Sequence, residues 1–192
     1  MTQQPVRVAV LVSGGGTNLQ ALLDALHDSP LARVARVISN RPDAGALDRA
    51  RRADPPVPAI VLRDPNDAAE LHSALGDAQL VVLAGYLKLI PASVVARFRG
   101  RMINIHPALL PDFGGPGMYG HRVHKAVLAS GAKESGATIH FVDENFDRGA
   151  IIAQEKVPVK KDDDAGTLAA RVLEAEHRLL TKVVLELAGR IS

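Results

Sequence analysis

The chain has 192 residues, 47% hydrophobic and 23% charged, which is the composition of a globular protein, and its length suits a single domain over residues 1–192. The 23 basic and 21 acidic residues nearly balance and aromatic residues make up only 3%, so nucleic-acid binding is disfavoured. The absence of cysteine excludes disulfides and thiolate metal sites. With no apolar stretch of membrane-spanning length and no export signal, we expect a cytoplasmic protein that has neither membrane nor nucleic-acid partners.

Short apolar runs alternate with amphipathic segments along the first hundred residues. The predicted strands are residues 6–13, 32–39, 57–62, 78–85 and 101–106. The predicted helices are residues 17–28, 44–53, 66–75 and 91–100. Thr17 and Gln20 form a capping-box pattern at the start of the first helix. This alternation predicts an α/β fold with a doubly wound, mostly parallel sheet and helices on both faces.

The last third of the chain departs from this alternation. Residues 121–130 predict a helix, and a final helix is expected from about residue 165 to residue 187. Between them, residues 135–143 and 149–159 predict two strands joined by a short acidic connection. We therefore expect an antiparallel strand pair near the C-terminus, appended to the parallel sheet.

A glycine-rich segment, SGGGTNLQ, lies between the first predicted strand and helix. Backbone amides at a helix N-terminus, with glycines that allow close approach, favour anion binding. Gly14 and Gly16 match the first half of a dinucleotide fingerprint, but Leu19 occupies the place of its third glycine, and no P-loop lysine follows. A single phosphate monoester, held by amides with Thr17 and Asn18, fits this pattern better. A tight turn without a ligand remains the alternative.

Asn104 and His106 lie two residues apart at the end of the predicted strand 101–106. Alternate residues of a strand point to the same face, so the two side chains share a side of the sheet. The carboxyl edge of a parallel sheet is where ligands bind. An amide donor beside an imidazole that titrates near ~6.5 can hold a developing oxyanion at an acyl carbon. An ordinary polar pair at a strand end is the alternative.

The acidic connection between the last two predicted strands offers a carboxylate partner for this pair. A connection longer than a tight turn is often functional. We expect Asp147 to reach His106, raise the affinity of its imidazole for a proton and relay a proton through water. Asp143 and Glu144 are expected to be solvated or capping residues.

Histidines also bind metals, so a zinc site needs consideration. His121 and His124 are spaced three apart and, together with His106 or His140, offer candidate ligands. However, the chain has no H-E-x-x-H motif and no cysteine, and His121 and His124 open a predicted helix, where surface or capping roles are ordinary. No G-x-S-x-G elbow is present either. We expect no metal and no serine nucleophile.

Five segments together resemble the phosphoribosylglycinamide formyltransferase family, over nearly the whole chain. They are VLVSGGGTNLQALLDA, VVLAGYLKLIP, INIHPALLP, SGATIHFVDENFDRGAIIAQEKVPV and RVLEAEHRLL. The resemblance implies a Rossmann-like formyltransferase fold. It also implies transfer of a formyl group from 10-formyltetrahydrofolate to the amine of glycinamide ribonucleotide, in purine biosynthesis, by a monomer or homodimer that needs no metal.

The resemblance also implies roles for individual positions. The catalytic positions are Asn104, His106 and Asp147, with Thr138 beside them. The positions that bind glycinamide ribonucleotide are Gly16, Thr17, Asn18 and Glu176, the last through the ribose hydroxyls. The folate-binding positions are Tyr86, Leu87, Lys88, Leu89, Ile90, Asn104, His140, Asp143 and Asp147.

In the implied reaction, the neutral amine attacks the formyl carbon. Protonated His106 and Asn104 stabilise the oxyanion, while Asp147 keeps His106 charged and passes a proton through water to the leaving nitrogen. The glycine loop anchors the phosphate and so holds the amine against the formyl group.

Two departures from the family pattern and several alternatives remain open. Residues 113–120, FGGPGMYG, form a longer loop than is common in the family, and it either shapes the mouth between the substrates or is a surface insertion. Lys88 stands where many members have arginine, which places a bidentate carboxylate contact in doubt. The alternative functions are formyltetrahydrofolate hydrolase, another folate-dependent formyltransferase, and a non-catalytic folate- or nucleotide-binding module.

Overall fold

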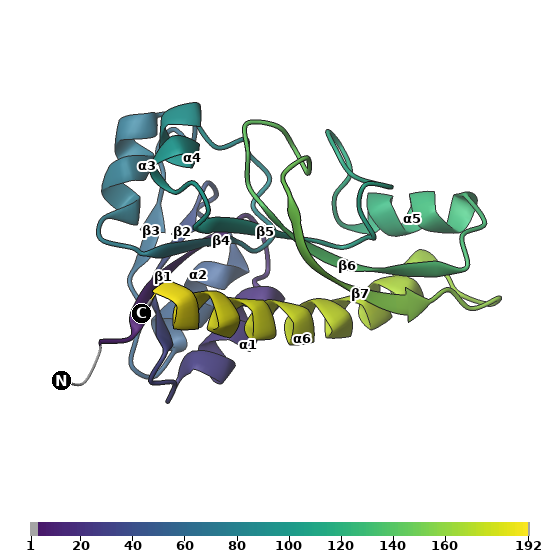
Figure 1. The fold of residues 1–192 in the computed structure, drawn as a ribbon, viewed down its shortest axis with the longest axis horizontal. Coiled ribbons are helices and arrows are strands. Elements are labelled where there is room, and N and C mark those ends of the chain that lie inside the picture. The colour runs from purple at the N-terminus through teal and green to yellow at the C-terminus, as the bar shows by residue number, and fades with distance from the viewer. Residues whose placement is uncertain (1–3, 192) are drawn as a thin grey trace.

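The computed structural model describes residues 4–191, which fold around a seven-stranded sheet with helices on both faces (Figure 1). The strands are β1 (Val6–Val12), β2 (Ala32–Ser39), β3 (Ala59–Val61), β4 (Leu80–Leu83), β5 (Met102–His106), β6 (Glu134–Phe141) and β7 (Ile151–Pro158). The helices are α1 (Thr17–Leu26), α2 (Gly45–Arg52), α3 (Ala68–Leu75), α4 (Ala92–Arg97), α5 (His121–Ala129) and α6 (Ala165–Ile191). The strand order is β3-β2-β1-β4-β5-β6-β7.

The first five strands pair in parallel, whereas β6 is antiparallel to both β5 and β7. The predicted doubly wound, mostly parallel sheet with an antiparallel pair near the C-terminus is therefore confirmed. Strand β6 ends beside the start of β5, because Phe141 pairs with Ile103 and the Val142 N–H donates to the Met102 carbonyl. The acidic loop between β6 and β7 leaves from there and folds back, so that Asp147 contacts Asn104 and His106.

Two hydrophobic cores lie on opposite faces of the sheet, and β1 contributes to both. Val8 and Val10 pack into the core covered by α1, α5 and α6, while Ala9 and Leu11 pack into the core covered by α3 and α4. This alternation follows from the period of two in a strand, and a strand buried on both faces needs apolar residues throughout.

The last helix, α6, runs along the sheet in Figure 1 and extends a few residues past the predicted end. One side of it is buried against the sheet, including Val172, Leu180 and Val184, while charged residues such as Arg178 face outward. No helix within residues 4–191 is both long and apolar enough to cross a membrane.

The capping box predicted at Thr17 and Gln20 is wrong. Gly16 occupies the N-cap with φ of 75°, no side chain caps the helix, and Thr17 is already helical. The Gln20 side chain instead donates to Asp24 at 2.8 Å and accepts from Arg49 at 3.2 Å. Because glycine turns the chain from strand to helix at positive φ, the amides of the first turn are left without a side-chain cap.

Candidate active site

A cavity of about 470 Å³ lies at the carboxyl edge of β1, β4 and β5. Its walls come from the glycine loop, the segments after β4 and β5, the loop between β6 and β7, and one face of α6. The structure gathers into these walls the sequence-predicted site residues Gly16, Thr17, Asn18, Tyr86, Leu87, Lys88, Leu89, Ile90, Asn104, His106, His140, Asp143, Asp147 and Glu176. Thr138 lies behind the wall rather than in it.

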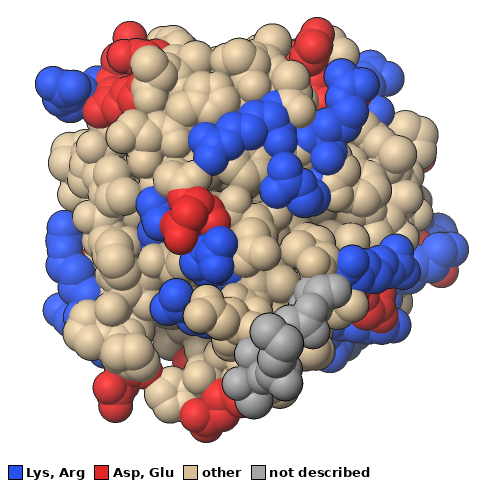
Figure 2. All heavy atoms as spheres, turned by 60° about the vertical axis from the view of Figure 1, so that its left-hand side comes forward, with Lys and Arg blue, Asp and Glu red and all other residues tan. Residues whose placement is uncertain are grey.

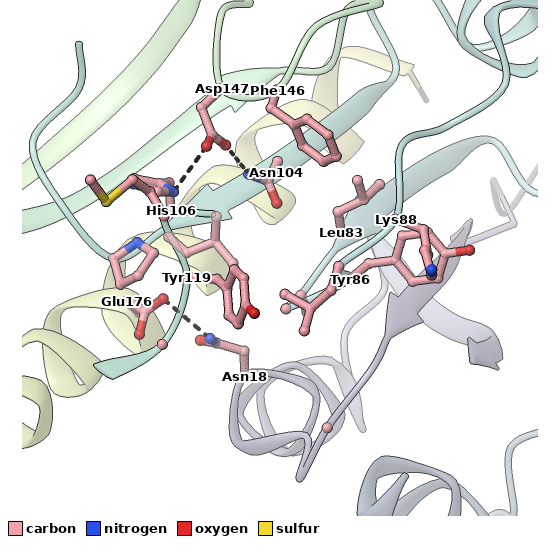
Figure 3. A pocket seen from close by; sticks show the side chains of 18 of the residues that line it. Asn18, Leu83, Tyr86, Lys88, Asn104, His106, Tyr119, Phe146, Asp147 and Glu176 are labelled. Carbon is pink, nitrogen blue, oxygen red and sulfur yellow. Dashed lines mark hydrogen bonds and ion pairs between the residues drawn. The ribbon is translucent and has the colours of Figure 1, made fainter. Parts of the chain in front are cut away.

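Asn104, His106 and Asp147 converge at one end of this cavity (Figure 3). Asn104 Nδ2 donates to Asp147 Oδ1 at 3.2 Å, and His106 Nδ1 lies 3.5 Å from Asp147 Oδ2. The first two side chains come from β5 and the third from the loop between β6 and β7. Asp147 adopts a φ of 54°, which is rare for a residue other than glycine and often marks a functional position.

His140 completes the hydrogen bonding of Asn104. His140 Nδ1 lies 2.8 Å from the Phe141 carbonyl, so this nitrogen carries the proton and Nε2 is left as an acceptor. Asn104 Nδ2 lies 3.0 Å from that Nε2. Both N–H groups of the Asn104 amide therefore have protein acceptors, Asp147 and His140, and its oxygen points into the cavity (Figure 3).

The backbone of the 113–120 loop contacts both His106 and Asp147. His106 Nε2 donates to the Phe113 carbonyl at 2.8 Å, and the Gly115 N–H donates to Asp147 Oδ2 at 2.9 Å. At Gly114 a side chain has no room, because a Cβ there lies 2.5 Å from Leu110 and 3.2 Å from Asp147. Of the two alternatives left open by the sequence, the structure therefore favours the loop as a wall of the cavity.

Burial sets the protonation of His106. Burial lowers its pKa below 6.5 and outweighs the opposing effects of Asp147 and the Phe113 carbonyl. Asp147 acts in the expected direction, but burial opposes it with the larger effect, which favours the neutral imidazole. Burial works to raise the pKa of Asp147, yet the contacts with His140, His106 and the Gly115 amide hold that pKa below its usual value.

At the other end of the cavity, the glycine loop and α6 present unpaired polar groups. Asn18 Nδ2 donates to Glu176 Oε1 at 3.5 Å, while Asn18 Oδ1 is buried without a partner among residues 4–191. Glu176 is only 8% exposed, and burial raises its pKa to about 7, with Asn18 opposing the shift. This carboxyl group is poised between its two protonation states at neutral pH.

The segment after β4 forms a third wall with an apolar rim. Leu87 and Leu89 are 44% and 45% exposed, and Lys88 has no ion-pair partner within the described part of the chain. Tyr86 and Ile90 are largely buried in the core under α3 and α4. Across the mouth, the exposed rings of Tyr119 and Phe146 add to this apolar rim. Neither ring was singled out from the sequence, although Phe146 lies in the segment 140–147, which the resemblance placed in the folate pocket, and Tyr119 lies in the 113–120 loop.

Thr138 acts on the turn that follows His106. Its hydroxyl donates to the Ala108 carbonyl at 2.6 Å and accepts from the Leu110 N–H at 3.0 Å. Gln154 Nε2 also donates to this oxygen at 2.9 Å. The buried hydroxyl thus fixes the chain where it leaves β5.

The prediction of a surface or capping role for His124 is wrong. His121 is exposed, but His124 is buried, lines the cavity and has Nδ1 without a partner within residues 4–191. Burial, with His121 and His106 nearby, lowers the pKa of His124 to about 4. No group of three or more His, Cys, Asp or Glu side chains in the described residues is arranged to hold a metal ion.

Known proteins share this sequence and fold. Residues 6–184 match the formyl transferase family. The chloroplastic phosphoribosylglycinamide formyltransferase of Arabidopsis thaliana is 46% identical over 93% of this chain and 64% of its own length. The phosphoribosylglycinamide formyltransferase of Haemophilus influenzae is 38% identical over 93% of this chain and 85% of its own. The crystal structure of the enzyme from Anaplasma phagocytophilum matches with a TM-score of 0.88 at 36% identity, over 96% of this chain and 87% of that one.

The chain thus spans less than two thirds of the Arabidopsis relative but most of the bacterial ones. The match of sequence and fold extends across all seven strands, from β1 into the last helix. The resemblance read from the five sequence segments is confirmed, and the chain belongs to the formyl transferase family.

Proposed function

We propose that this chain transfers the formyl group of 10-formyltetrahydrofolate to the amine of glycinamide ribonucleotide, giving formylglycinamide ribonucleotide and tetrahydrofolate in purine biosynthesis. One observation carries the proposal: a single cavity holds the Asn104, His106 and Asp147 cluster at one end and a glycine loop rich in free amides at the other. Relatives named for this acceptor, in Arabidopsis and Haemophilus, support the choice of substrate.

The two substrates occupy different walls of the cavity. The phosphate lies against the amides of the glycine loop at Gly16, Thr17 and Asn18, because a helix N-terminus favours an anion. The buried carboxyl of Glu176 accepts hydrogen bonds from the ribose hydroxyls. The folate lies along the apolar rim, with residues 86–90 on one side and residues 140–147 on the other. Lys88, at the mouth, supplies a single cation for the folate carboxylates.

The reaction begins when the neutral amine attacks the formyl carbon. The C=O electron pair moves to oxygen, and the nitrogen becomes an ammonium centre. Asn104 stabilises the oxyanion by giving up its bond to the His140 ring, since a charged oxygen is the stronger acceptor. The resulting tetrahedral intermediate holds both nitrogen substituents.

The path of the proton depends on which ring nitrogen of His106 carries a hydrogen. The His106 Nε2–H is fixed by the Phe113 carbonyl, so Nδ1 carries the lone pair and takes the proton from the attacking nitrogen. The Asp147 carboxylate, 3.5 Å away, stabilises the imidazolium that forms. The proton then passes, through water, to the leaving folate nitrogen as its bond to the formyl carbon breaks. In this proposal His106 is neutral before the attack, whereas the sequence led us to expect a protonated His106.

The test is an assay of formyl transfer from 10-formyltetrahydrofolate to glycinamide ribonucleotide, beside phosphate-free glycinamide riboside. We expect rapid transfer to the ribonucleotide and slow transfer to the riboside, because the phosphate holds the amine in place. Release of formate without acceptor formylation would instead identify a hydrolase. Binding of folate with neither reaction would identify a non-catalytic module.

We also propose that residues 1–192 act as one formyltransferase domain in the cytoplasm, on small molecules and without nucleic acid, membrane or metal. The near balance of charge supports the absence of a nucleic-acid partner. Size-exclusion chromatography with light scattering would decide between the monomer and the homodimer.

A further inference from the structure

Helix α2 lies behind the glycine loop and holds two of its carbonyl groups. The Ala46 N–H donates to the Gly14 carbonyl at 3.1 Å, and Arg49 Nε donates to the Gly15 carbonyl at 2.7 Å. Arg49 Nη1 also donates to Gln20 Oε1 on α1 at 3.2 Å, so its guanidinium bridges the loop and the helix that follows it. Both carbonyls therefore point toward α2.

The direction of these carbonyls fixes the direction of the amides. The carbonyl and the following N–H of a trans peptide point in opposite directions, and the cis peptides of the described chain lie elsewhere. The Gly15 N–H therefore points away from Ala46, and the Gly16 N–H points away from Arg49. Neither N–H has an acceptor within residues 4–191, and both glycines line the main cavity.

The glycine loop packs directly against α2. A Cβ on Gly16 lies 2.6 Å from the Ala46 Cβ, so only glycine fits against the helix there. Gly15 lines the main cavity and also a second hollow, which Arg49 and Arg52 line as well. Arg49 thus contacts the loop from behind, while the free amides face the cavity.

The charge of Arg49 strengthens the amide that it orients. A hydrogen bond from a guanidinium is charge-assisted and stronger than one between neutral groups. Because neighbouring hydrogen bonds polarise one another through a shared peptide, the Gly16 N–H becomes a better donor to an anion. An ammonium at this position also donates to the Gly15 carbonyl, but it lacks the geometry to bridge to Gln20.

We propose that Arg49 is a positioning residue for the substrate phosphate: it fixes and polarises the peptide between Gly15 and Gly16 so that its N–H faces the anion. This inference rests on the proposed function, in which the glycine loop holds the phosphate of glycinamide ribonucleotide.

The first test compares Arg49→Met with Arg52→Met and Arg49→Lys. Arg52 lies in the same hollow and carries the same charge, but it is exposed and donates to no loop carbonyl. We expect Arg49→Met to raise the KM for glycinamide ribonucleotide tenfold or more, with kcat and the KM for 10-formyltetrahydrofolate within twofold. Arg49→Lys should recover part of the loss, and Arg52→Met should stay within twofold of wild type. If Arg49→Met and Arg52→Met raised this KM equally, the positive charge alone would explain the effect of Arg49. That result would overturn the inference.

The second test removes the phosphate from the substrate. Arg49→Met should leave kcat/KM for the phosphate-free riboside within twofold of wild type, because the residue acts through the phosphate. If the riboside and the ribonucleotide lose kcat/KM equally, Arg49 maintains the fold and does not position the phosphate. Thermal unfolding of each variant measures that structural effect directly.

A third measurement separates this inference from the proposed reaction. Inorganic phosphate should raise the Tm of the wild type and of Arg52→Met by several degrees, and that of Arg49→Met much less. This pattern supports the inference even if the wild type fails to formylate glycinamide ribonucleotide, a failure that would refute only the proposed reaction. An equal rise in Tm for wild type and Arg49→Met would refute the inference. If Arg49→Met does not fold, Arg49→Lys carries the same comparison, with a smaller rise than wild type expected.

Discussion

The two edges of the sheet use their polar groups in opposite ways. At the carboxyl edge, atoms such as Asn18 Oδ1 and His124 Nδ1 are buried without partners in the described chain, and the glycine-loop amides are open. Around the amino edge, arginines donate to backbone carbonyls at the end of α3: Arg36 to Ala74 at 3.1 Å and Arg97 to His72 at 3.2 Å. The open groups of the carboxyl edge face a cavity, whereas the arginines of the amino edge bond to the protein itself, although Arg36 Nε is buried without a partner within residues 4–191.

Figure 2 shows the side of the molecule on which α3 and α4 lie. Blue Lys and Arg side chains spread over it among largely uncharged atoms, with acidic groups beside some of them. Arg97, at the end of α4, and Arg101 have structural contacts, since both lie over the Phe98 ring, at 4.9 and 5.4 Å from its centre. The comparison teaches that basic side chains on a surface indicate a binding site only when they are not already bonded to other groups of the protein. The following four substitutions, ordered by expected effect, test the division between the two edges.

Asn104→Ala at the carboxyl edge should have the largest effect. Loss of one oxyanion donor typically costs about 2.7–4 kcal/mol of transition-state stabilisation, so kcat should fall about a hundredfold or more. Steady-state kinetics with both substrates measure it, and the KM for the folate should change little. A fall of less than tenfold in kcat, with collapse of substrate binding, would assign Asn104 to binding instead.

Glu176→Gln should stabilise the protein in a pH-dependent way. Burial raises the pKa of the carboxyl from 4.5 to about 7, so the folded state holds a proton that the unfolded state releases. The carboxyl therefore does not lower the unfolding free energy below pH 4.5. Its destabilising effect grows as the pH rises and reaches about 3 kcal/mol at about pH 7.

Urea unfolding at several pH values checks the Glu176 prediction. Glu176→Gln should raise the unfolding free energy at pH 8 by up to that amount and leave it unchanged near pH 4. The same variant should bind glycinamide ribonucleotide more weakly. A gain of equal size at both pH values would show that the effect comes from packing.

Arg101→Met at the amino edge should lower stability and leave activity intact. Its guanidinium donates to the Gln79 carbonyl at 3.1 Å and to the Arg97 carbonyl at 3.0 Å. Hydrogen bonds from charged groups contribute about 1.5–3 kcal/mol when buried, but one of these two bonds is exposed and the other only partly buried. Because water replaces part of what is lost at the surface, we expect the unfolding free energy to fall by about 2 kcal/mol in all. A kcat/KM that fell more than twofold would contradict the division between the edges.

Asp77→Asn should have the smallest effect. Asp77 forms ion pairs with Arg7 and Arg36, but its side chain is 62% exposed. Exposed pairs contribute about 0–1 kcal/mol and are screened by salt. The unfolding free energy should therefore drop by less than about 1 kcal/mol, with a smaller difference from wild type at 1 M salt. A loss above 2 kcal/mol would show that this acid organises the whole arginine cluster.

Strand order along the chain was predictable because the signals are local. Continuous apolar runs mark β1 and β4, and the placement of Asn104 and His106 on one face of β5 follows from strand parity alone. Asp147 was reached by combining an acidic loop with a family resemblance. The capping box failed because Gly16, rather than a side chain, sets the entry to α1.

Other features of the site depend on contacts that no local pattern encodes. The burial of His124 depends on segments folded over α5, while the 113–120 loop contacts His106 and Asp147 through its backbone, whose direction side-chain identity does not reveal. The role of Arg49 is equally hidden, because a guanidinium on a helix usually faces water.

The sequence by itself determined the order of strands and helices, the apolar faces, the family and the residue types at the carboxyl edge. The elements and their apolar faces arise from propensity and periodicity within a few residues, whereas the family follows from the resemblance of five segments. The tertiary structure alone decided that burial would lower the pKa of His106, that it would raise the pKa of Glu176 to about 7, and where the glycine-loop amides would point. Protonation and hydrogen-bond direction depend on groups brought together from distant positions, as Asn104 and Asp147 are from 43 residues apart.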